Sequence, residues 1–356
     1  MKDIQSTKTD NRPTIEQSSS PWKHVSSENW NNCLWQQEHS LQGYNALTAL
    51  LQDHDDESDN GCIRELVERY RFRVTPYYLS LIDWSDPKDP VRRQCIPDLY
   101  EIADEPEYPA DPFLEEGTVS ACGIVHRFPD RVLLVASSSC AMYCRHCTRK
   151  NTLDQMHPTA DKDYVPALEY IADNPQVREV LISGGDPLLL NTKTLDDLLG
   201  KVQEIEHVEV VRIGTRVPVV LPMRIDDELA EMLGRHKPLW INTQFNHPRE
   251  LTENAIAACR KLTDAGIPVS NQSVLLKGIN DDFETMRELC TKLQSNLIRP
   301  YYVFQCDPIA GISRFRTDIT VGGKLEKQLR ESIGGLALPR FVADIPGRKG
   351  KTPLNV

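Results

Sequence analysis

The chain has 356 residues, and its 41 basic and 52 acidic side chains give a net charge of −11. This length is enough for one barrel-sized domain with an extension, or for two ordinary domains. The acidic balance argues against a nucleic-acid-binding surface, which would be basic. Ten cysteines without even spacing, and no apolar stretch of signal or membrane-span length, predict a cytoplasmic protein without a membrane partner.

The first third of the chain shows two different patterns. Residues 1–20 are polar and nearly free of large apolar side chains, so we expect a disordered tail there. Over residues 21–115, apolar side chains recur at three- and four-residue spacing, most clearly in residues 41–51 and 63–70. Pro-rich connectors interrupt this pattern. We therefore expect a helical N-terminal extension over residues 21–115.

Residues 116–356 alternate between strand and helix patterns. Apolar runs predict buried strands at residues 132–135, 180–182, 208–213, 239–242, 267–269 and 301–304. Helical patterns lie between them at residues 165–172, 195–205, 228–233, 254–265 and 283–293. These repeated units predict an α/β fold, a parallel sheet closed or partly closed into a TIM-like (β/α)6 barrel with helices outside. Functional residues of such a barrel belong at the carboxyl ends of its strands.

Three cysteines follow the first predicted strand with the spacing Cys-x3-Cys-x2-Cys: Cys140, Cys144 and Cys147. Thiolates hold iron–sulfur clusters, and three of them on a [4Fe–4S] cluster leave one iron free to bind a small molecule. A structural zinc site with His146 as the fourth ligand is the alternative, but adjacent ligands at positions 146 and 147 fit a tetrahedron poorly. A disulfide would need an oxidising compartment, to which nothing in the sequence points.

A glycine pair follows the second predicted strand, in the run Ser183, Gly184, Gly185 and Asp186. Two glycines let a backbone approach a ligand closely, and a strand edge there can pair with the main-chain groups of an amino-acid-like ligand. Alone, such a turn is more often only a tight connection between a strand and a helix.

The cysteine spacing resembles that of the radical S-adenosylmethionine (SAM) enzymes, whose open iron binds SAM and whose cluster donates the electron that cleaves it. This resemblance implies that residues 183–186 bind SAM. Longer matching words resemble the lysine 2,3-aminomutase family in particular, and they lie at residues 77–83, 126–131, 140–149, 212–216, 245–248, 271–276 and 350–354. The similarity covers the chain from about residue 30 to its end.

The resemblance implies a second cofactor, pyridoxal 5′-phosphate (PLP). Lys351 matches the lysine that forms a Schiff base with PLP, although Arg348 and Lys349 interrupt the glycine-rich approach of other family members. Whether these two residues contact PLP is left open. Without the resemblance, Lys351 would be taken for a mobile residue near a chain end.

Arg127, Arg131 and Gln272 match the residues that bind the PLP phosphate, and the planar fork of arginine suits phosphate oxygens. Without the resemblance, the two arginines would be an ordinary surface ion-pair cluster. Gln244 stands where relatives have a histidine near SAM, and the resemblance implies that Gln244 binds SAM there.

The resemblance also implies the substrate residues. Arg149 matches the ligand of the substrate α-carboxylate, and Asp307 and Asp344 match the pair that binds the distal ammonium of lysine. Two carboxylates favour a cationic side chain and repel an anionic one. The implied reaction exchanges the α-amino group and a C3 hydrogen of L-lysine to give β-lysine.

Three alternatives stay open. Arginine 2,3-aminomutase is one, because guanidinium also suits two carboxylates. A second is the (R)-β-lysine-forming enzyme associated with elongation factor P. A third, from a different class, is a non-catalytic iron–sulfur or zinc scaffold.

The resemblance also bears on the partners of the protein. The resemblance implies an external electron donor such as flavodoxin or ferredoxin. The sequence stops at Val356, before the cysteine-bearing tail with which longer family members bind zinc and assemble. We therefore expect no such zinc site, and homo-oligomer formation is left open.

Overall fold

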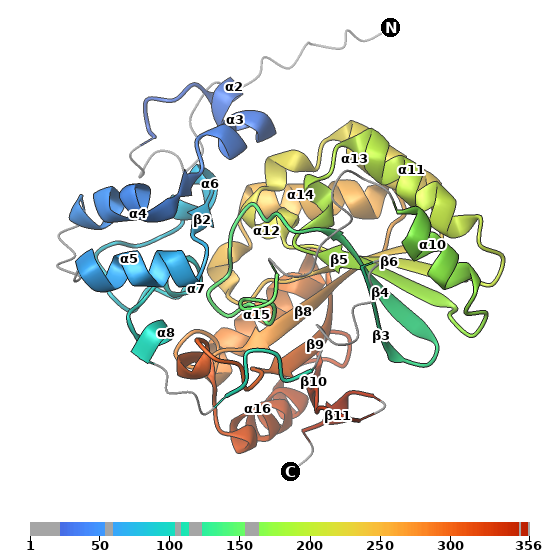
Figure 1. Ribbon diagram of the computed structural model, residues 1–356. Helices are drawn as coiled ribbons and strands as arrows, with labels where there is room; N and C mark the ends of the chain where they lie inside the picture. The colour runs from blue at the N-terminus through green and yellow to red at the C-terminus, as the bar shows by residue number, and fades with distance from the viewer. Residues whose placement is uncertain are drawn as a thin grey trace, which may run out of the picture.

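The computed structural model describes residues 22–53, 60–103, 108–113, 123–153, 164–348 and 350–354. The tail expected over residues 1–20, the boundary expected between residues 115 and 116, and Lys349 lie outside these ranges. Within them, a group of short N-terminal helices lies beside a large sheet that other helices cover (Figure 1).

The N-terminal extension consists mainly of short helices. They are α2 (Ser27–Trp30), α3 (Cys33–Glu38), α4 (Gly43–Gln52), α5 (Asn60–Arg69), α6 (Pro76–Leu79), α7 (Arg92–Cys95) and α8 (Tyr100–Ala103). The two-residue strands β1 (Leu41–Gln42) and β2 (Arg73–Val74) pair antiparallel among them. The helices expected from the apolar spacing at residues 41–51 and 63–70 are confirmed as α4 and α5.

A nine-stranded sheet forms the body of the molecule, in the order β11-β10-β9-β8-β7-β6-β5-β4-β3. Its parallel strands are β4 (Arg131–Ser137), β5 (Glu179–Gly184), β6 (Val210–Gly214), β7 (Leu239–Thr243), β8 (Val269–Leu275), β9 (Arg299–Gln305) and β10 (Arg340–Ala343). The edge strands β3 (Ile124–Phe128) and β11 (Thr352–Pro353) are antiparallel to their neighbours. The expected parallel α/β architecture is confirmed, and the described strands form an open sheet rather than a closed barrel.

Helices connect successive parallel strands on the outside of the sheet, as the pattern predicts. The longer ones are α10 (Val165–Ala172), α11 (Thr192–Gln203), α13 (Asp227–Arg235), α14 (Glu253–Asp264), α15 (Phe283–Ser295) and α16 (Ile319–Ser332). Shorter ones are α12 (Val217–Val220), η1 (Pro187–Leu189), η2 (Pro222–Arg224), η3 (Pro248–Glu250) and η4 (Ser313–Phe315). None of the helices in the described ranges is long and apolar enough to span a membrane.

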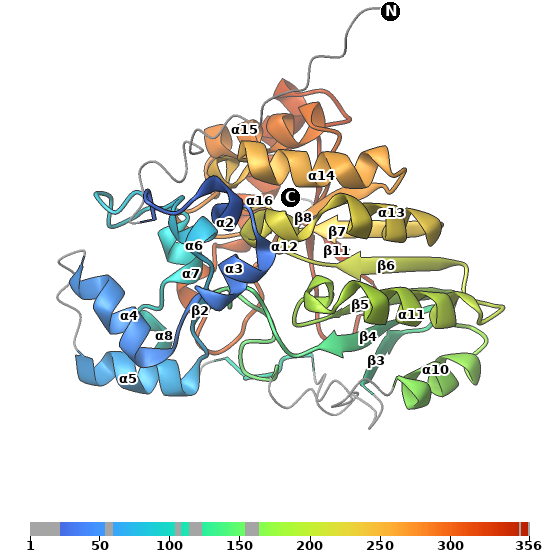
Figure 2. The same cartoon turned by 90° about the horizontal axis from the view of Figure 1, so that it is seen from above.

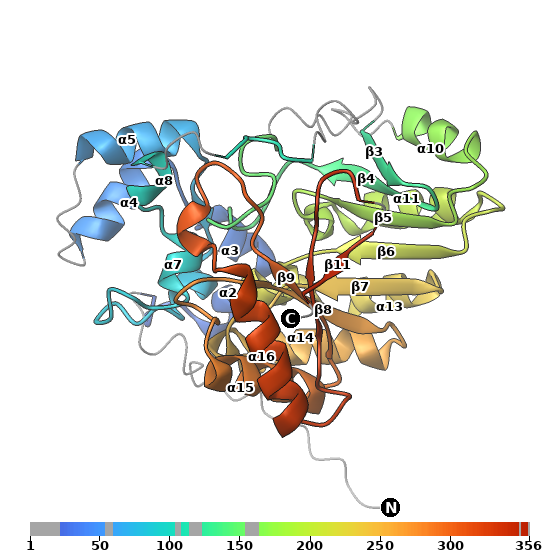
Figure 3. The same cartoon turned by 90° about the horizontal axis from the view of Figure 1, so that it is seen from below.

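Helix α16 is the one long helix of the described chain that the pattern analysis does not predict. It lies beside β10 and β11 (Figure 3). Two successive glycines interrupt its helical signal, because glycine has a low helix propensity. Gly322 packs closely against the C-terminal strand, since a Cβ atom there would lie 2.7 Å from the side chain of Leu354.

Arg127 and Arg131, which precede the first predicted strand at residues 132–135, lie on a hairpin. Arg127 belongs to β3, and Arg131 begins β4 and pairs with Phe128. The pattern analysis misses β3 because its last three residues are only half-buried, so that it has no long apolar run.

The N-terminal extension lies beyond the carboxyl ends of the first parallel strands. In Figure 2 the arrowheads of β4 and β6 point toward its helices. Hydrogen bonds join the two parts: the Thr75 hydroxyl donates to the carbonyl of Val220 at 2.7 Å, and the Tyr78 hydroxyl donates to Glu250 at 2.6 Å. The extension therefore closes over the edge of the sheet where functional residues are expected.

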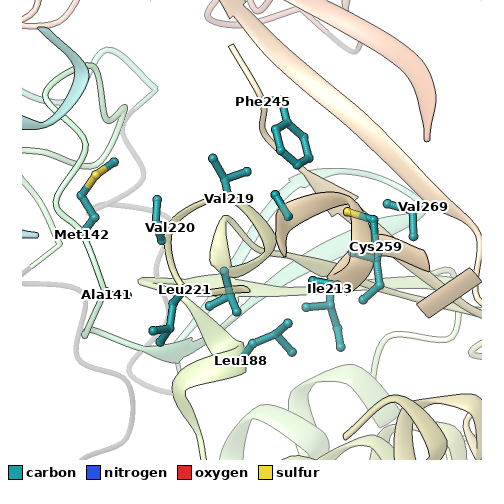
Figure 4. Close-up of a cluster of buried hydrophobic side chains, with 14 of the residues drawn as sticks. Ala141, Met142, Leu188, Ile213, Val219, Val220, Leu221, Phe245, Cys259 and Val269 are labelled. Atoms are coloured by element: carbon teal, nitrogen blue, oxygen red, sulfur yellow. The ribbon is translucent and has the colours of Figure 1, made fainter. Parts of the chain in front are cut away.

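The cysteine loop that follows β4 is packed into the main apolar core. Figure 4 shows part of this core, which includes Ala141 and Met142 of the loop as well as Val220 and Leu221. Ala141 and Met142 are 1% and 2% exposed. Burial of these two side chains anchors the loop between the neighbouring cysteines.

Candidate active site

A cavity of about 330 Å³ lies at the carboxyl ends of the parallel strands. The cysteine loop after β4, the glycine turn after β5 and the ends of β6, β7 and β8 line it, together with residues 69–71 of the extension. The predicted site residues on its wall are Cys140, Cys144, Cys147, Arg149, Ser183, Gly184, Gly185, Asp186, Gln244 and Gln272. The residues expected to bind the cluster and SAM thus share one cavity.

The cysteine loop places three free thiols on the cavity wall. Burial raises the pKa of Cys140 and of Cys147, and neighbouring thiols raise both further. Three thiolates so close together need a bound cation to balance their charge, which the irons of a cluster supply. Within the described residues, no three His, Cys, Asp or Glu side chains converge on a point that would hold a single metal ion.

Two basic residues hold the cysteine loop against the extension. Glu101 of α8 is 1% exposed, and it accepts hydrogen bonds from Arg145 Nε at 3.0 Å and from Lys150 Nζ. The Arg145 amide donates to the carbonyl of Gln94 at 2.9 Å. Burial would raise the pKa of Glu101, but the charges of Arg145 and Lys150 outweigh burial and lower it to about 2. The ionised Glu101 therefore fixes the loop by contacts within the protein. Sequence reasoning misses this carboxylate, since nothing local links it to the loop.

The glycine pair after β5 contacts the chain that leads into the cysteine loop. Gly184 has φ +113°, which side chains rarely adopt, and a Cβ atom there would lie 2.5 Å from the carbonyl oxygen of Ser137. At Gly185 a Cβ atom would lie 2.5 Å from the carbonyl oxygen of Ser139. The close approach that the sequence analysis assigns to a ligand is therefore also required by the fold.

Asp186 is buried, and its carboxylate accepts four hydrogen bonds from the protein. The donors are the Thr215 hydroxyl at 2.7 Å and the amides of Arg216, Val217 and Leu188 at 2.7, 3.1 and 3.1 Å. Burial raises the pKa of Asp186 to about 6 against the effect of these bonds. Asp186 thus joins the ends of β5 and β6 and shapes the cavity wall.

Gln244 contacts His146 on the cavity wall, with their Nε2 atoms 3.2 Å apart. The Nδ2 atom of Asn246 is also 3.2 Å from His146 Nε2. Burial lowers the pKa of His146 well below its ordinary value, so the ring is neutral. Because amide donors face Nε2, the ring proton is assigned to Nδ1. That atom is buried without a partner in the described chain, which suits a ligand that brings a hydrogen-bond acceptor.

Lys351 lies beside Asp344 because β10 and β11 form a hairpin. Ala343 pairs with Thr352, so the next residues along the hairpin, Asp344 and Lys351, face each other. Lys351 Nζ donates to the Asp344 carboxylate. Arg127 Nη2 donates to the same carboxylate at 3.1 Å. One acid therefore pairs with two of the three basic residues expected to bind PLP.

Aromatic rings surround this ion-pair group. Lys351 Nζ lies 5.6 Å from the ring centre of Phe128 and 5.2 Å from that of Phe304. The guanidinium groups of Arg127 and Arg131 lie 5.4 and 4.1 Å from the Phe128 ring. Phe304 also lines the main cavity, so the lysine end adjoins the cysteine end.

The remaining predicted residues fall near these two groups. Asp307 lies two residues beyond β9, and the parallel pairing of Val342 with Phe304 places it at the same sheet edge as Asp344. Gln272 lies on β8 and lines the main cavity, as does Arg149 just after the cysteines. Asp344 and Lys351 belong to the neighbouring ion-pair group, and none of Asp307, Asp344 and Lys351 lines the main cavity, as far as the described residues show.

The residues present fit the cofactors that the resemblance implies. Three thiols on one loop are the donor set of an iron–sulfur cluster with one open iron. The unpaired Nδ1 of His146 beside them suits a polar ligand such as SAM. A lysine with two arginines around one ring suits an aldehyde that carries a phosphate.

Comparisons with known proteins show which families this chain is similar to. Residues 134–290 match the family model described as the Radical SAM superfamily. The chain is 44% identical to the L-lysine 2,3-aminomutase of Clostridium subterminale over 334 residues, which cover 94% of this chain and 80% of that protein. It is 42% identical to a putative L-lysine 2,3-aminomutase of Aquifex aeolicus, over 94% of this chain and 90% of the relative. A glutamate 2,3-aminomutase of Clostridioides difficile is 40% identical, over 92% of this chain and 77% of the relative.

Proposed function

The chain belongs to the lysine 2,3-aminomutase family of radical SAM enzymes, and on this basis we propose that it moves the α-amino group of L-lysine from C2 to C3, giving β-lysine. The protein is an isomerase whose family uses a [4Fe–4S] cluster, SAM and PLP. Its substrate is an amino acid, and the residues of the site determine which amino acid it accepts.

The observation that carries the choice of substrate is the carboxylate of Asp344. Its side chain is 11% exposed and pairs with Lys351 and Arg127, so its surroundings already suit cations. Asp307 lies at the same sheet edge on the neighbouring strand. Two acids favour the distal ammonium of lysine by charge-assisted hydrogen bonds and repel the distal carboxylate of glutamate.

The two ends of the site have separate tasks in this proposal. When bound, the cluster and SAM supply a radical that removes hydrogen from carbon, and PLP carries the migrating amino group. Cys140, Cys144 and Cys147 hold the cluster. Residues 183–186 and Gln244 position SAM beside it. The buried loop keeps water away from the reacting carbon.

The lysine end binds PLP and substrate. Lys351 would hold the PLP aldehyde through Nζ, and Arg127, Arg131 and Gln272 would hold its phosphate. Lys351 Nζ donates to Asp344, so it has to leave this ion pair and give up a proton before the amine can act as a nucleophile.

Substrate positioning uses residues at both ends. Arg149 binds the α-carboxylate of lysine from the cysteine loop. Asp344, once released by Lys351, joins Asp307 in binding the distal ammonium. The substrate is thereby held at both of its ends, which fixes C3 relative to the radical source.

The proposal includes the setting of the enzyme. It places the protein in the cytoplasm, where a flavodoxin or ferredoxin supplies one electron to the cluster for each reductive step. A homo-oligomer is possible, and the molar mass of the protein in solution would show whether it forms.

Anaerobic turnover tests this function. The purified protein, reconstituted with iron, sulfide and PLP, should convert L-lysine to β-lysine in the presence of SAM and dithionite, as measured by chromatography of derivatised amino acids. Arginine, ornithine and glutamate are assayed in parallel. Product from arginine in preference to lysine would identify an arginine 2,3-aminomutase. No product from any basic amino acid would contradict the proposal, and iron loading without SAM cleavage would support a scaffold.

Asp344→Asn provides the sharper test of substrate choice. Loss of one charged hydrogen bond costs about 1.5–3 kcal/mol, so kcat/KM for lysine should fall about 10- to 100-fold. Asp227→Asn is the matched control, because its side chain is 82% exposed and pairs only at the surface with Lys261. Equal kcat/KM in both variants would remove Asp344 from the substrate site.

A further inference from the structure

Arg216, just beyond β6, donates a hydrogen bond to one of the cysteines. Its Nη1 atom lies 2.8 Å from Cys144 Sγ. Arg216 is 7% exposed and lines the cavity, and its guanidinium is permanently charged. A fixed cation therefore faces the sulfur of a predicted cluster ligand. In the sequence, Arg216 lies in the stretch 212–216 that resembles the family, and this resemblance implies no role for it.

Hydrogen bonds from the other nitrogens of the guanidinium group fix the orientation of Arg216. Its Nη2 atom donates to Gln94 Oε1 at 2.6 Å and to Glu250 Oε1 at 2.7 Å. Its Nε atom donates to the carbonyl of Gln244 at 3.1 Å. These partners come from the N-terminal extension and from the chain after β7. The guanidinium can thus keep its distance to Cys144 without help from solvent.

Glu250 is the counter-charge of this arginine, and it is itself held rigidly. It is fully buried and accepts hydrogen bonds from the Tyr78 hydroxyl at 2.6 Å and from the amides of Asn246 and His247 at 2.6 and 2.9 Å. The result is a buried ion pair with its positive end on Cys144 and its negative end turned away.

Such a pair acts on the charge of the cysteine sulfur. Hydrogen bonds to ligand sulfurs and the net charge nearby set the reduction potential of an iron–sulfur cluster. Reduction adds one electron, taken from the external donor, and it makes and breaks no bond. A donor that stabilises negative charge on Cys144 stabilises the reduced cluster more than the oxidised one. A negative charge behind that donor weakens the effect.

We propose that Arg216 is a positioning residue that raises the reduction potential of the cluster through Cys144, and that Glu250 limits this rise. The proposal rests on the proposed function, because it takes the cysteine loop to hold a [4Fe–4S] cluster. It adds a determinant of how readily the donor can reduce the enzyme.

The test is an anaerobic redox titration of the reconstituted protein without lysine, followed by the electron paramagnetic resonance signal of the reduced cluster. Glu250→Gln keeps the arginine and removes its counter-charge, so the reduction equilibrium should shift at least tenfold toward the reduced cluster, or about 59 mV for one electron. The double variant Arg216→Gln/Glu250→Gln removes the pair without leaving a lone buried charge. It should shift the equilibrium at least tenfold the other way.

Arg224→Gln is the matched control. Arg224 is also buried, but it donates to the carbonyls of Leu188 and Leu190, so its loss should lower stability and leave the potential unchanged. The proposal would be overturned if wild type, Glu250→Gln and the double variant had the same reduction potential. It would also be overturned if both test variants shifted the potential in the same direction from wild type. If the double variant binds no iron, Glu250→Gln decides alone, and an unchanged potential there refutes it.

The titration also separates this inference from the proposed function. A wild-type protein that makes β-lysine while the variants keep its potential refutes the role of Arg216 and leaves the function standing. Ordered shifts in a protein that makes no β-lysine refute the function and leave the role of Arg216 standing.

Discussion

The cysteine end and the lysine end of the site differ in what holds their side chains. At the cysteine end, Arg145 and Lys150 have side chains that are 1% and 4% exposed, and both pair with the fully buried Glu101. At the lysine end, Lys351 and Arg127 share Asp344 and keep 27% and 16% exposure. The first is an internal part of the fold, whereas the second is a group of ion pairs in contact with water.

This difference follows from position in the fold. The cysteine loop is enclosed between the sheet and the N-terminal extension, where its apolar residues also enter the core. Lys351 precedes the two-residue edge strand β11. Buried charges are strongly coupled to their partners, and exposed pairs are screened. We infer that the cysteine end is built in advance, while the ion pairs of the lysine end give way to ligands.

Glu101→Gln should have the largest effect on this comparison. It removes the carboxylate that pairs with Arg145, Lys150 and Arg314, and breaking a buried ion pair in this way costs about 3–5 kcal/mol. Urea unfolding of the apo-protein should show that loss, and iron bound after reconstitution should fall because the cysteine loop loses its anchor.

Glu209→Gln is the control for this variant. Arg178 and Glu209 form a surface ion pair whose side chains are 47% and 61% exposed, so the loss should stay below about 1 kcal/mol. Similar losses of unfolding free energy in the two variants would show that the cysteine end is no more firmly held than the surface.

The features that could be predicted are those that a short stretch of sequence reveals by itself. Apolar runs predict six of the seven parallel strands in the described chain, all except β10, and the cysteine spacing predicts the loop. Strand β8 is longer than the run at residues 267–269 indicates. Its polar residues Asn271 and Ser273 are buried, and both donate to the carbonyl of Phe245. A strand with buried polar side chains gives no apolar run, and only the fold supplies their partners.

The contacts that hold the site could not be predicted. Arg216 and Gln94 are 122 residues apart along the chain, and Arg145 and Glu101 are 44 apart. No periodic pattern links such pairs, because tertiary packing alone brings them together. Lys351 and Asp344 could be named only through the resemblance, and the hairpin register then explains why they meet.

Low pH should also weaken the cysteine end, with a somewhat smaller loss of unfolding free energy than Glu101→Gln. The ordinary pKa of Glu101 is 4.5, and in the folded protein it is about 2, because the nearby cations outweigh burial. The unfolded chain therefore binds the proton first as the pH falls. The stability that this carboxylate contributes is fully present above pH 4.5 and is lost as the pH falls toward 2, up to about 3 kcal/mol in all.

Urea unfolding of wild type and Glu101→Gln over a pH series measures this contribution. The difference in unfolding free energy should narrow from about pH 4.5 downward, relative to its value at about pH 5.5. A difference that stays constant in acid would mean that Glu101 does not carry its charge in the folded protein.

The smallest effect on stability is expected at the lysine end, from Lys351→Met. Asp344 keeps Arg127 as a partner in this variant, and a partly exposed ion pair contributes about 1 kcal/mol or less. Stability and function should therefore separate: urea unfolding should hardly change, while the visible absorbance of lysine-bound PLP should be absent after dialysis. Lys324→Met, an exposed change on α16, should leave both unchanged. A loss of several kcal/mol in Lys351→Met would contradict the contrast, because the lysine end would then be as firmly built into the fold as the cysteine loop.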